Sequence, residues 1–159
     1  YEAFGRRPEL KNPKRYTEKI QKSILSERNP LYHKLVDKAA VKEYVASVIG
    51  EEYVVPTLGV WSRVEDIDWD TLPDRFVLKC THDSGSAVIC RDKASFDRVS
   101  ACRHLDGCLK RDYWKTSREW AYKGLKHRVI AEPYLPDLAS AAVSNEVSDY
   151  KLFCFGGKP

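Results

Sequence analysis

The sequence predicts an α+β fold, and three observations support this prediction. Apolar residues recur at helical spacing before Gly50 and again after Ser95, whereas short β-rich runs lie between and after these segments. The expected order is helix, strand, hairpin, helix, strand, loop and strand, which differs from the regular alternation of βαβ units. A length of 159 residues corresponds to about one domain.

Composition and charge are those of an ordinary globular domain. Hydrophobic residues make up 43% and charged residues 31% of the chain, and no apolar run approaches the ~20 residues of a membrane span. Tyr1–Pro8 lacks the apolar core of a signal peptide. The net charge of +4 suits an anionic ligand but does not demand nucleic acid. Five cysteines without a C-x-x-C pair argue against a zinc site or a disulfide framework, and favour small buried apolar residues in a reducing cytoplasm.

The first amphipathic helix is expected before Asn29. A basic, proline-containing lead-in over Arg6–Arg15 precedes it. Its apolar residues are spaced at intervals of four, at Tyr16, Ile20 and Ile24. Asn29–Pro30 is a stop signal followed by a restart, and a short turn is expected over Leu31–Leu35.

A second helix and an irregular strand are expected next. Asp37 can cap this helix and Gly50 can close it. Its expected apolar face comprises Val41, Tyr44, Val45, Val48 and Ile49. Tyr53–Trp61 is β-rich but interrupted by Pro56, which favours an edge strand. Ser62–Pro73 is acidic and turn-like, with room for one short helix.

A hairpin and a long helix follow. Arg75–Cys80 and Ala87–Arg91 are the expected strands, and His82–Ser86 is the glycine-bearing turn between them. Ser95 can cap the long helix. The residues expected near one face of that helix are Val99, Cys102, Leu109 and Tyr113.

The remaining chain is expected to contain two more strands. Trp120 and Tyr122 indicate a short helical piece before the apolar strand Val129–Ala131. Pro136–Asp149 is a polar loop, and Tyr150–Phe155 is the final strand. Because the chain contains no Met, begins at Tyr1 and stops where a partner strand should follow, we expect it to be truncated at both ends.

Lys79 and the turn after it form the first candidate site. The lysine ends an otherwise apolar strand, where burial is costly unless the ammonium meets an anion. A turn with a glycine and two serines can direct N–H and hydroxyl groups at phosphate, although G-x-x-x-x-G-K-[ST] is absent. The alternative is an ordinary hairpin turn with an exposed lysine. Asp37–Lys38 alone is a helix cap with a surface lysine, and Ile130–Leu135 alone is a strand that ends at a proline.

Taken in order, these segments resemble the nucleotide site of ATP-grasp enzymes. That site has a DK helix, a strand with a proline, a strand-end lysine with a flexible loop, and an E-x-x-[LIV] linker. The matching stretches here are Asp37–Lys38 with Val41–Lys42, Val55–Pro56, Phe76–Lys79 and Ala131–Leu135.

The local sequence is similar to that of a narrower group, the TupA-like ATP-grasp family of bacterial polysaccharide biosynthesis. The resemblance covers nearly the whole chain, and its specificity lies in the order and spacing of several motifs. The motifs that carry it are Lys11–Lys14 with Thr17–Ile20, Leu35–Lys38 with Val41–Val45, Leu78–Gly85, Arg118–Trp120 with Tyr122–Lys123, Val129–Leu135, and Asp149–Phe155 with Gly157–Pro159.

The resemblance implies a division of the chain and a set of ATP contacts. Residues 1–36 would be a helical lead-in, 37–135 the first lobe with its hairpin phosphate loop, and 136–159 the start of an incomplete second lobe. Lys38 and Lys79 would contact the phosphates. The implied loop residues over the phosphates are His82, Ser84, Gly85 and Ser86. The implied adenine linker consists of Glu132, Pro133, Tyr134 and Leu135, with the carbonyl of Pro133 and the N–H of Leu135 facing the base.

Some positions leave alternatives open. Lys151 could face the phosphates from the second lobe or be an exposed strand lysine, and the ribose carboxylate could be Asp137 or Glu146. Asp83 would repel phosphate unless it points away or pairs with a basic group. Ser86 stands where many relatives carry a glycine, which makes the flexibility of the loop an open question.

The function implied by the resemblance is that of an ATP-dependent ligase. Such enzymes activate a carboxylate as an acyl phosphate, which an amine or other nucleophile then attacks. ATP and Mg²⁺ are the implied cofactors, with a polysaccharide or sugar acid as the acceptor in a cytoplasmic, glycosyltransferase-associated pathway. The magnesium ligands and catalytic residues are expected beyond Pro159, so no metal ligand is expected within the fragment and its own activity is left open.

Two rival interpretations remain. A non-catalytic module could bind nucleic acid or polysaccharide through a basic N-terminal segment and four tryptophans, although such residues also form solvated helix faces and cores. These residues are Arg6–Arg7, Lys11, Lys14–Arg15, Lys19, Lys22, Trp61, Trp69, Trp114 and Trp120. A kinase is disfavoured because H-R-D and D-F-G motifs are absent.

Overall fold

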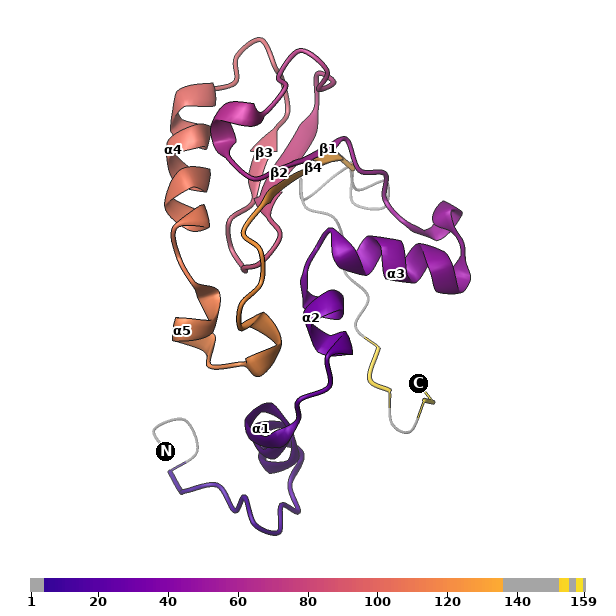
Figure 1. Cartoon of the computed structure of the whole chain (residues 1–159), viewed down its shortest axis with the longest axis vertical. Helices are drawn as coiled ribbons and strands as arrows, with labels where there is room; N and C mark the ends of the chain where they lie inside the picture. Colours follow the sequence, from indigo (N-terminus) through magenta and orange to yellow (C-terminus); the bar gives the residue numbers. More distant parts are fainter. Residues whose placement is uncertain (1–4, 136–151, 155–156, 159) are drawn as a thin grey trace, which may run out of the picture.

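Four short strands form an antiparallel sheet in the order β1-β4-β2-β3, which confirms the α+β prediction (Figure 1). The computed structural model describes residues 5–135, 152–154 and 157–158. The strands are β1 (Gly59–Trp61), β2 (Phe76–Cys80), β3 (Val88–Cys90) and β4 (Val129–Pro133). The central pair, β2 and β4, runs from Phe76 opposite Pro133 to Cys80 opposite Val129. β3 pairs with β2, so the expected hairpin is present. β1 lies at one edge, but only the last three residues of the expected edge strand Tyr53–Trp61 form it.

Three helices precede the first strand in the chain, and two lie between β3 and β4. They are α1 (Tyr16–Ser26), α2 (Leu31–Val36), α3 (Ala40–Ile49), α4 (Arg98–Leu109) and α5 (Tyr113–Ser117), with short 3₁₀ turns η1 (Glu51–Tyr53), η2 (Val64–Asp66) and η3 (Trp120–Tyr122). The prediction of a short turn over Leu31–Leu35 was wrong, because this segment forms the helix α2. Leu152–Cys154 is not in a strand, and the rest of the expected strand Tyr150–Phe155 lies outside the described residues, as does the loop Pro136–Asp149.

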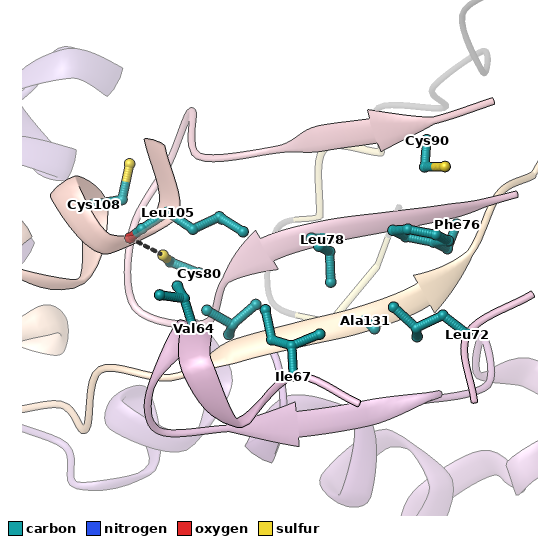
Figure 2. Close-up of a cluster of buried hydrophobic side chains, with 11 residues drawn as sticks. Val64, Ile67, Leu72, Phe76, Leu78, Cys80, Cys90, Leu105, Cys108 and Ala131 are labelled. Carbon is teal, nitrogen blue, oxygen red and sulfur yellow. Dashed lines mark hydrogen bonds between the residues drawn. The ribbon is translucent and has the colours of Figure 1, made fainter. Parts of the chain in front are cut away.

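The apolar core lies on the face of the sheet toward α4. Along β2 the side chains alternate, so Phe76, Leu78 and Cys80 are fully buried on one face. Figure 2 shows this cluster, in which the thiol of Cys80 points to the carbonyl of Leu105 on α4 at 3.9 Å. Burial raises the pKa of the Cys80 thiol to about 12. Three of the five free cysteines are buried, as expected, whereas Cys154 is exposed.

The cap and the buried face of α4 differ from the prediction. Asp97, not Ser95, caps the helix by accepting the N–H of Ser100 at 2.9 Å. The hydroxyl of Ser95 is instead engaged with Asp92 in the preceding turn. The buried side chains of the helix are Ala101, Leu105 and Cys108. Val99 is 69% exposed, and Tyr113 belongs to α5.

The first helix forms where expected, but its apolar stripe stays largely exposed. Tyr16 is 53% and Ile20 is 41% exposed. α1 lies away from the sheet (Figure 1), and its buried residue is Glu18. This carboxylate forms an ion pair with Arg6 at 2.6 Å and accepts backbone N–H groups of the lead-in, so a polar network organises this segment.

Candidate nucleotide site

A groove of about 320 Å³ lies between α3 and the sheet, on the side opposite the apolar core. Its polar lining consists of Lys38, Lys42, Lys79 and Glu132. Its apolar lining consists of Val41, Val45, Tyr53, Val54 and Val55. Other hollows of the described chain are larger, including one of about 640 Å³ between β3 and α4, but none of them is lined by three lysines.

Strand alternation places Lys79 and Glu132 in this groove. In the register of the central pair, Lys79 lies opposite Ile130, so these two side chains are on the same face of the sheet. Glu132 lies two residues further along β4, so both side chains leave the sheet on the α3 side. The Lys79 ammonium donates to Glu132 Oε2 at 2.5 Å.

Lys42, from the first turn of α3, completes the cluster. Its ammonium donates to Glu132 Oε1 at 2.7 Å, and the Lys42 side chain is only 13% exposed. Burial by itself raises the pKa of Glu132, but hydrogen bonds from Lys42 and Lys79 and their charges outweigh this effect and hold the pKa below its usual range. Glu132 is therefore an ionised carboxylate with two cationic partners.

Lys38 reaches the same groove from the turn before α3. Its ammonium donates to the carbonyl of Cys80 at 3.0 Å and to the carbonyl of Asp83. Burial lowers the pKa of Lys38, the charge of Asp83 opposes this shift, and the nearby charge of Lys79 adds to it. Lys38 and Lys79 therefore bring like charges to the same groove.

Asp37 fixes the position of Lys38. It is 4% exposed and accepts the backbone N–H groups of Ala39 and Ala40, each at 2.9 Å, so it caps the turn that leads into α3, whose own N-cap residue is Ala39. Its carboxylate also accepts from Arg128 at 3.2 Å and from the Thr81 hydroxyl at 3.2 Å. The next backbone N–H, that of Lys38, donates to the carbonyl of Thr81 at 2.9 Å. The ends of three elements, α3, β2 and β4, therefore meet at one carboxylate.

The expected phosphate loop has a fixed base and an exposed tip. The Ser86 hydroxyl donates to Asp83 Oδ1 at 2.6 Å and accepts the N–H of Cys80 at 2.8 Å, and Ser86 is 1% exposed. Ser84 and Gly85 are exposed, and Gly85 has a φ of +88° that favours glycine. Asp83 lies 4.0 Å from the Lys38 ammonium, so it pairs with a basic group.

His82 belongs to the buried base of this loop. Its ring stacks on that of His127 at 3.7 Å with an interplanar angle of 8°, and its Nε2 donates to the carbonyl of Arg111 at 3.1 Å. Burial lowers the pKa of His82, and a charge on His127 lowers it further. Nδ1 is buried and has no hydrogen-bond partner among the described residues. As placed, His82 connects the loop to the end of α4 and lies away from solvent.

The four expected linker residues are only partly gathered at the groove. Glu132 lines it, and Pro133 ends β4 opposite Phe76. The N–H of Tyr134 donates to the carbonyl of Arg75 at 3.4 Å, and Leu135 is 45% exposed. Three further candidates, Lys151, Asp137 and Glu146, lie outside the described residues.

The structure thus brings together Lys38, Lys79 and Glu132 of the predicted residues, and it adds Lys42. The sequence contained a signal for this lysine, because Lys42 belongs to the stretch Val41–Lys42 that accompanies Asp37–Lys38 in the family resemblance. Arg128 was also missed, since nothing in the local sequence connects it to Asp37, 91 residues away.

The described residues suit an anion better than a metal ion. Within them, no three His, Cys, Asp or Glu side chains are grouped as metal ligands. The two carboxylates at the groove are already engaged, Glu132 by lysines and Asp83 by Ser86 and Lys38. Every helix in the described part of the chain is too short or too polar to cross a membrane.

The tryptophans of the rival basic module are packed into the protein. Trp61 and Trp69 lie against the core cluster. Trp120 contacts the ring of His33 at 4.2 Å, and Trp114 lies beneath a lysine and an arginine. All four tryptophan side chains are half-buried, so these residues do not form an array of free rings for stacking.

Comparison with known proteins identifies a family for the chain. No curated protein and no solved structure has significant similarity to the chain. The family model described as TupA-like ATPgrasp matches residues 18–159, which is most of the chain. This match confirms the resemblance of the motifs, and the chain therefore belongs to the TupA-like ATPgrasp family.

Proposed function

We propose that the groove beside α3 binds the phosphates of ATP, as the first lobe of an ATP-grasp ligase. Membership of the ATP-grasp family indicates ATP-dependent, ligase-type function. The observation that supports this use of the groove is that Lys79, on β2, meets Lys38 and Lys42, from the start of α3, in one small space. The three ammonium groups outnumber their carboxylate partners, Glu132 and Asp83, by one. Burial lowers the pKa of Lys38, an effect that the charge of Asp83 opposes and the charge of Lys79 reinforces.

The charge balance of the groove suits a polyphosphate. Three ammonium groups face two carboxylates, Glu132 and Asp83, which leaves a net positive charge. Each lysine is a point charge with three donors, and such groups stabilise the negative charge of a phosphoryl group in transfer. The exposed tip at Ser84–Gly85 offers backbone N–H groups and a hydroxyl that can close over the phosphates.

The remaining roles follow the family pattern. Lys38 and Lys79 hold the phosphates, and the strand end Glu132–Leu135 holds adenine through the carbonyl of Pro133 and the N–H of Leu135. Residues 37–135 act as the first lobe, residues 1–36 as a helical lead-in and residues 136–159 as the start of the second lobe. Mg²⁺, when bound with ATP, supplies charge neutralisation. The described residues contribute no ligand set for it.

The proposed reaction is the activation of a carboxylate as an acyl phosphate, which an amine or another nucleophile then attacks. The proposed setting is the cytoplasmic assembly of bacterial surface polysaccharides, with a sugar acid or polysaccharide as the acceptor. The basic-module alternative predicts a different behaviour, namely binding of RNA or polysaccharide without any effect of ATP.

A thermal unfolding experiment tests the proposal. At an ATP concentration of about 100 Kd, binding should stabilise the chain by about 2.7 kcal/mol and raise Tm by about 5–10 °C. Lys79→Met should abolish this shift, because the methionine keeps the stem and removes the ammonium. Lys110→Met is the control, since Lys110 is an exposed lysine paired with Asp106 on α4, away from the groove. Absence of an ATP-dependent shift in the wild type, together with salt-dependent RNA binding, would overturn the proposal.

A further inference from the structure

Each carboxylate oxygen of Glu132 has its own lysine. Oε1 accepts from Lys42 at 2.7 Å and Oε2 accepts from Lys79 at 2.5 Å. A single cation would neutralise this carboxylate, so the cluster holds one positive charge more than Glu132 requires. Glu132 is only 13% exposed, which means that water compensates its charge poorly.

The two lysines are not equivalent. Lys79 is 26% exposed, whereas Lys42 is 13% exposed and also donates to the carbonyl of Pro56 at 3.4 Å. Lys79 therefore has the greater freedom to turn toward a ligand in the groove, and Lys42 is held in place. If Lys79 left and no other cation lay beside Glu132, this largely buried carboxylate would have no positive partner, which is a strongly unfavourable change.

We propose that Lys42 is a positioning residue that keeps Glu132 neutralised when Lys79 turns from Glu132 to the phosphates of ATP. This inference rests on the proposed function and assigns a division of labour within the same groove. In the free protein Lys79 is bound to the carboxylate of Glu132, and in the complex it binds the phosphates of ATP instead. Lys42 makes this exchange possible because it stays bound to Glu132.

Two other roles for Lys42 predict different behaviour. If Lys42 contacts the phosphates directly, its removal weakens ATP binding whether or not Glu132 is charged. If Lys42 only supports the fold, its removal lowers the stability of the free protein and leaves the affinity of the folded chain unchanged. A role through Glu132 predicts that loss of Lys42 matters only while Glu132 is ionised.

A double-mutant cycle separates these roles. The variants are Lys42→Met, Glu132→Gln and their combination, all in the full chain, with ATP affinity measured by isothermal titration calorimetry at fixed ionic strength. Methionine keeps the buried stem of Lys42, and glutamine keeps the shape of Glu132 without its charge. Lys110→Met is the control for loss of one positive charge from the protein surface.

Lys42→Met should weaken ATP binding about tenfold or more, which corresponds to ~1.4 kcal/mol. In the Glu132→Gln background the same substitution should change affinity less than about twofold, because no carboxylate then competes for Lys79. Thermal melting without ATP should show that each variant is folded. Equal loss of affinity in both backgrounds, or loss in neither, would overturn the role of Lys42, whereas absence of ATP binding to the wild type would overturn both this role and the proposed function.

Discussion

Removal of the Asp37 carboxylate should destabilise the protein more than removal of its charge. The side chain is 4% exposed and accepts from the N–H groups of Ala39 and Ala40, from the Thr81 hydroxyl and from Arg128. Asp37→Ala removes all of these interactions. Asp37→Asn removes the charge but leaves a carbonyl oxygen that can still accept the two backbone N–H groups at the start of α3.

The expected magnitudes follow from the individual contacts. Loss of the helix cap costs about 1 kcal/mol, and loss of the largely buried hydrogen bond to Thr81 costs about 1 kcal/mol. The ion pair adds only about 1 kcal/mol, because the Arg128 side chain is 30% exposed and solvent screens it. Asp37→Ala should therefore cost about 3 kcal/mol and lower Tm by about 6–12 °C. Asp37→Asn should cost about 1 kcal/mol.

Urea unfolding followed by circular dichroism measures both values, with equal m-values as the check that the unfolding transition is comparable. Arg128→Met serves as the partner control and should cost more than Asp37→Asn, because it leaves the buried, charged carboxylate of Asp37 without its cation, whereas asparagine is neutral. The reasoning is refuted if Asp37→Ala and Asp37→Asn are equally stable, or if Asp37→Ala loses less than about 0.5 kcal/mol.

Three further outcomes are expected. Leu105→Ala should cost about 2–5 kcal/mol in urea unfolding because it opens a cavity against the sheet, whereas Val99→Ala on the exposed side of the same helix should stay within about 0.5 kcal/mol. The hydrogen bond from Arg6, followed by backbone N–H groups, lowers the pKa of Glu18 from 4.5 to about 2. The contribution of Glu18 to stability should thus be complete above pH 4.5 and lost as the pH falls toward 2, and a carboxyl ¹³C titration with a midpoint near 4.5 would contradict this. In the native protein at about pH 8, a thiol reagent should modify Cys154 first, with the buried thiols reacting only on unfolding.

The sequence predicted the strands of the described sheet better than it predicted the helix faces. The expected strand Arg75–Cys80 differs from β2 by one residue, and the structure adds that Lys79 lies on the face away from Leu78. In α4 the apolar residues admit two stripes, and the structure buries the one with Leu105 while Val99 stays in solvent. Only the position of the sheet decides between such stripes, and that position depends on contacts far along the chain.

The candidate site shows the same division between local and long-range information. Lys38 and Lys79 were identified from motifs that are each a few residues long. The partnership of Lys42 with Glu132 spans 90 residues, and that of Asp37 with Arg128 spans 91. Pairings across such separations are fixed by strand register and helix docking, so a single sequence could not predict them.

The alternation along β2 also has a consequence for folding. A slip of β2 by one residue against β4 would place the ammonium of Lys79 in the apolar core where Leu78 lies, and would turn that leucine toward water. In such a misaligned sheet the ammonium of Lys79 would be buried without a partner, and Glu132 would lose its hydrogen bond from Lys79. The same charges that we assign to ATP binding therefore penalise the nearest wrong pairing of the central strands.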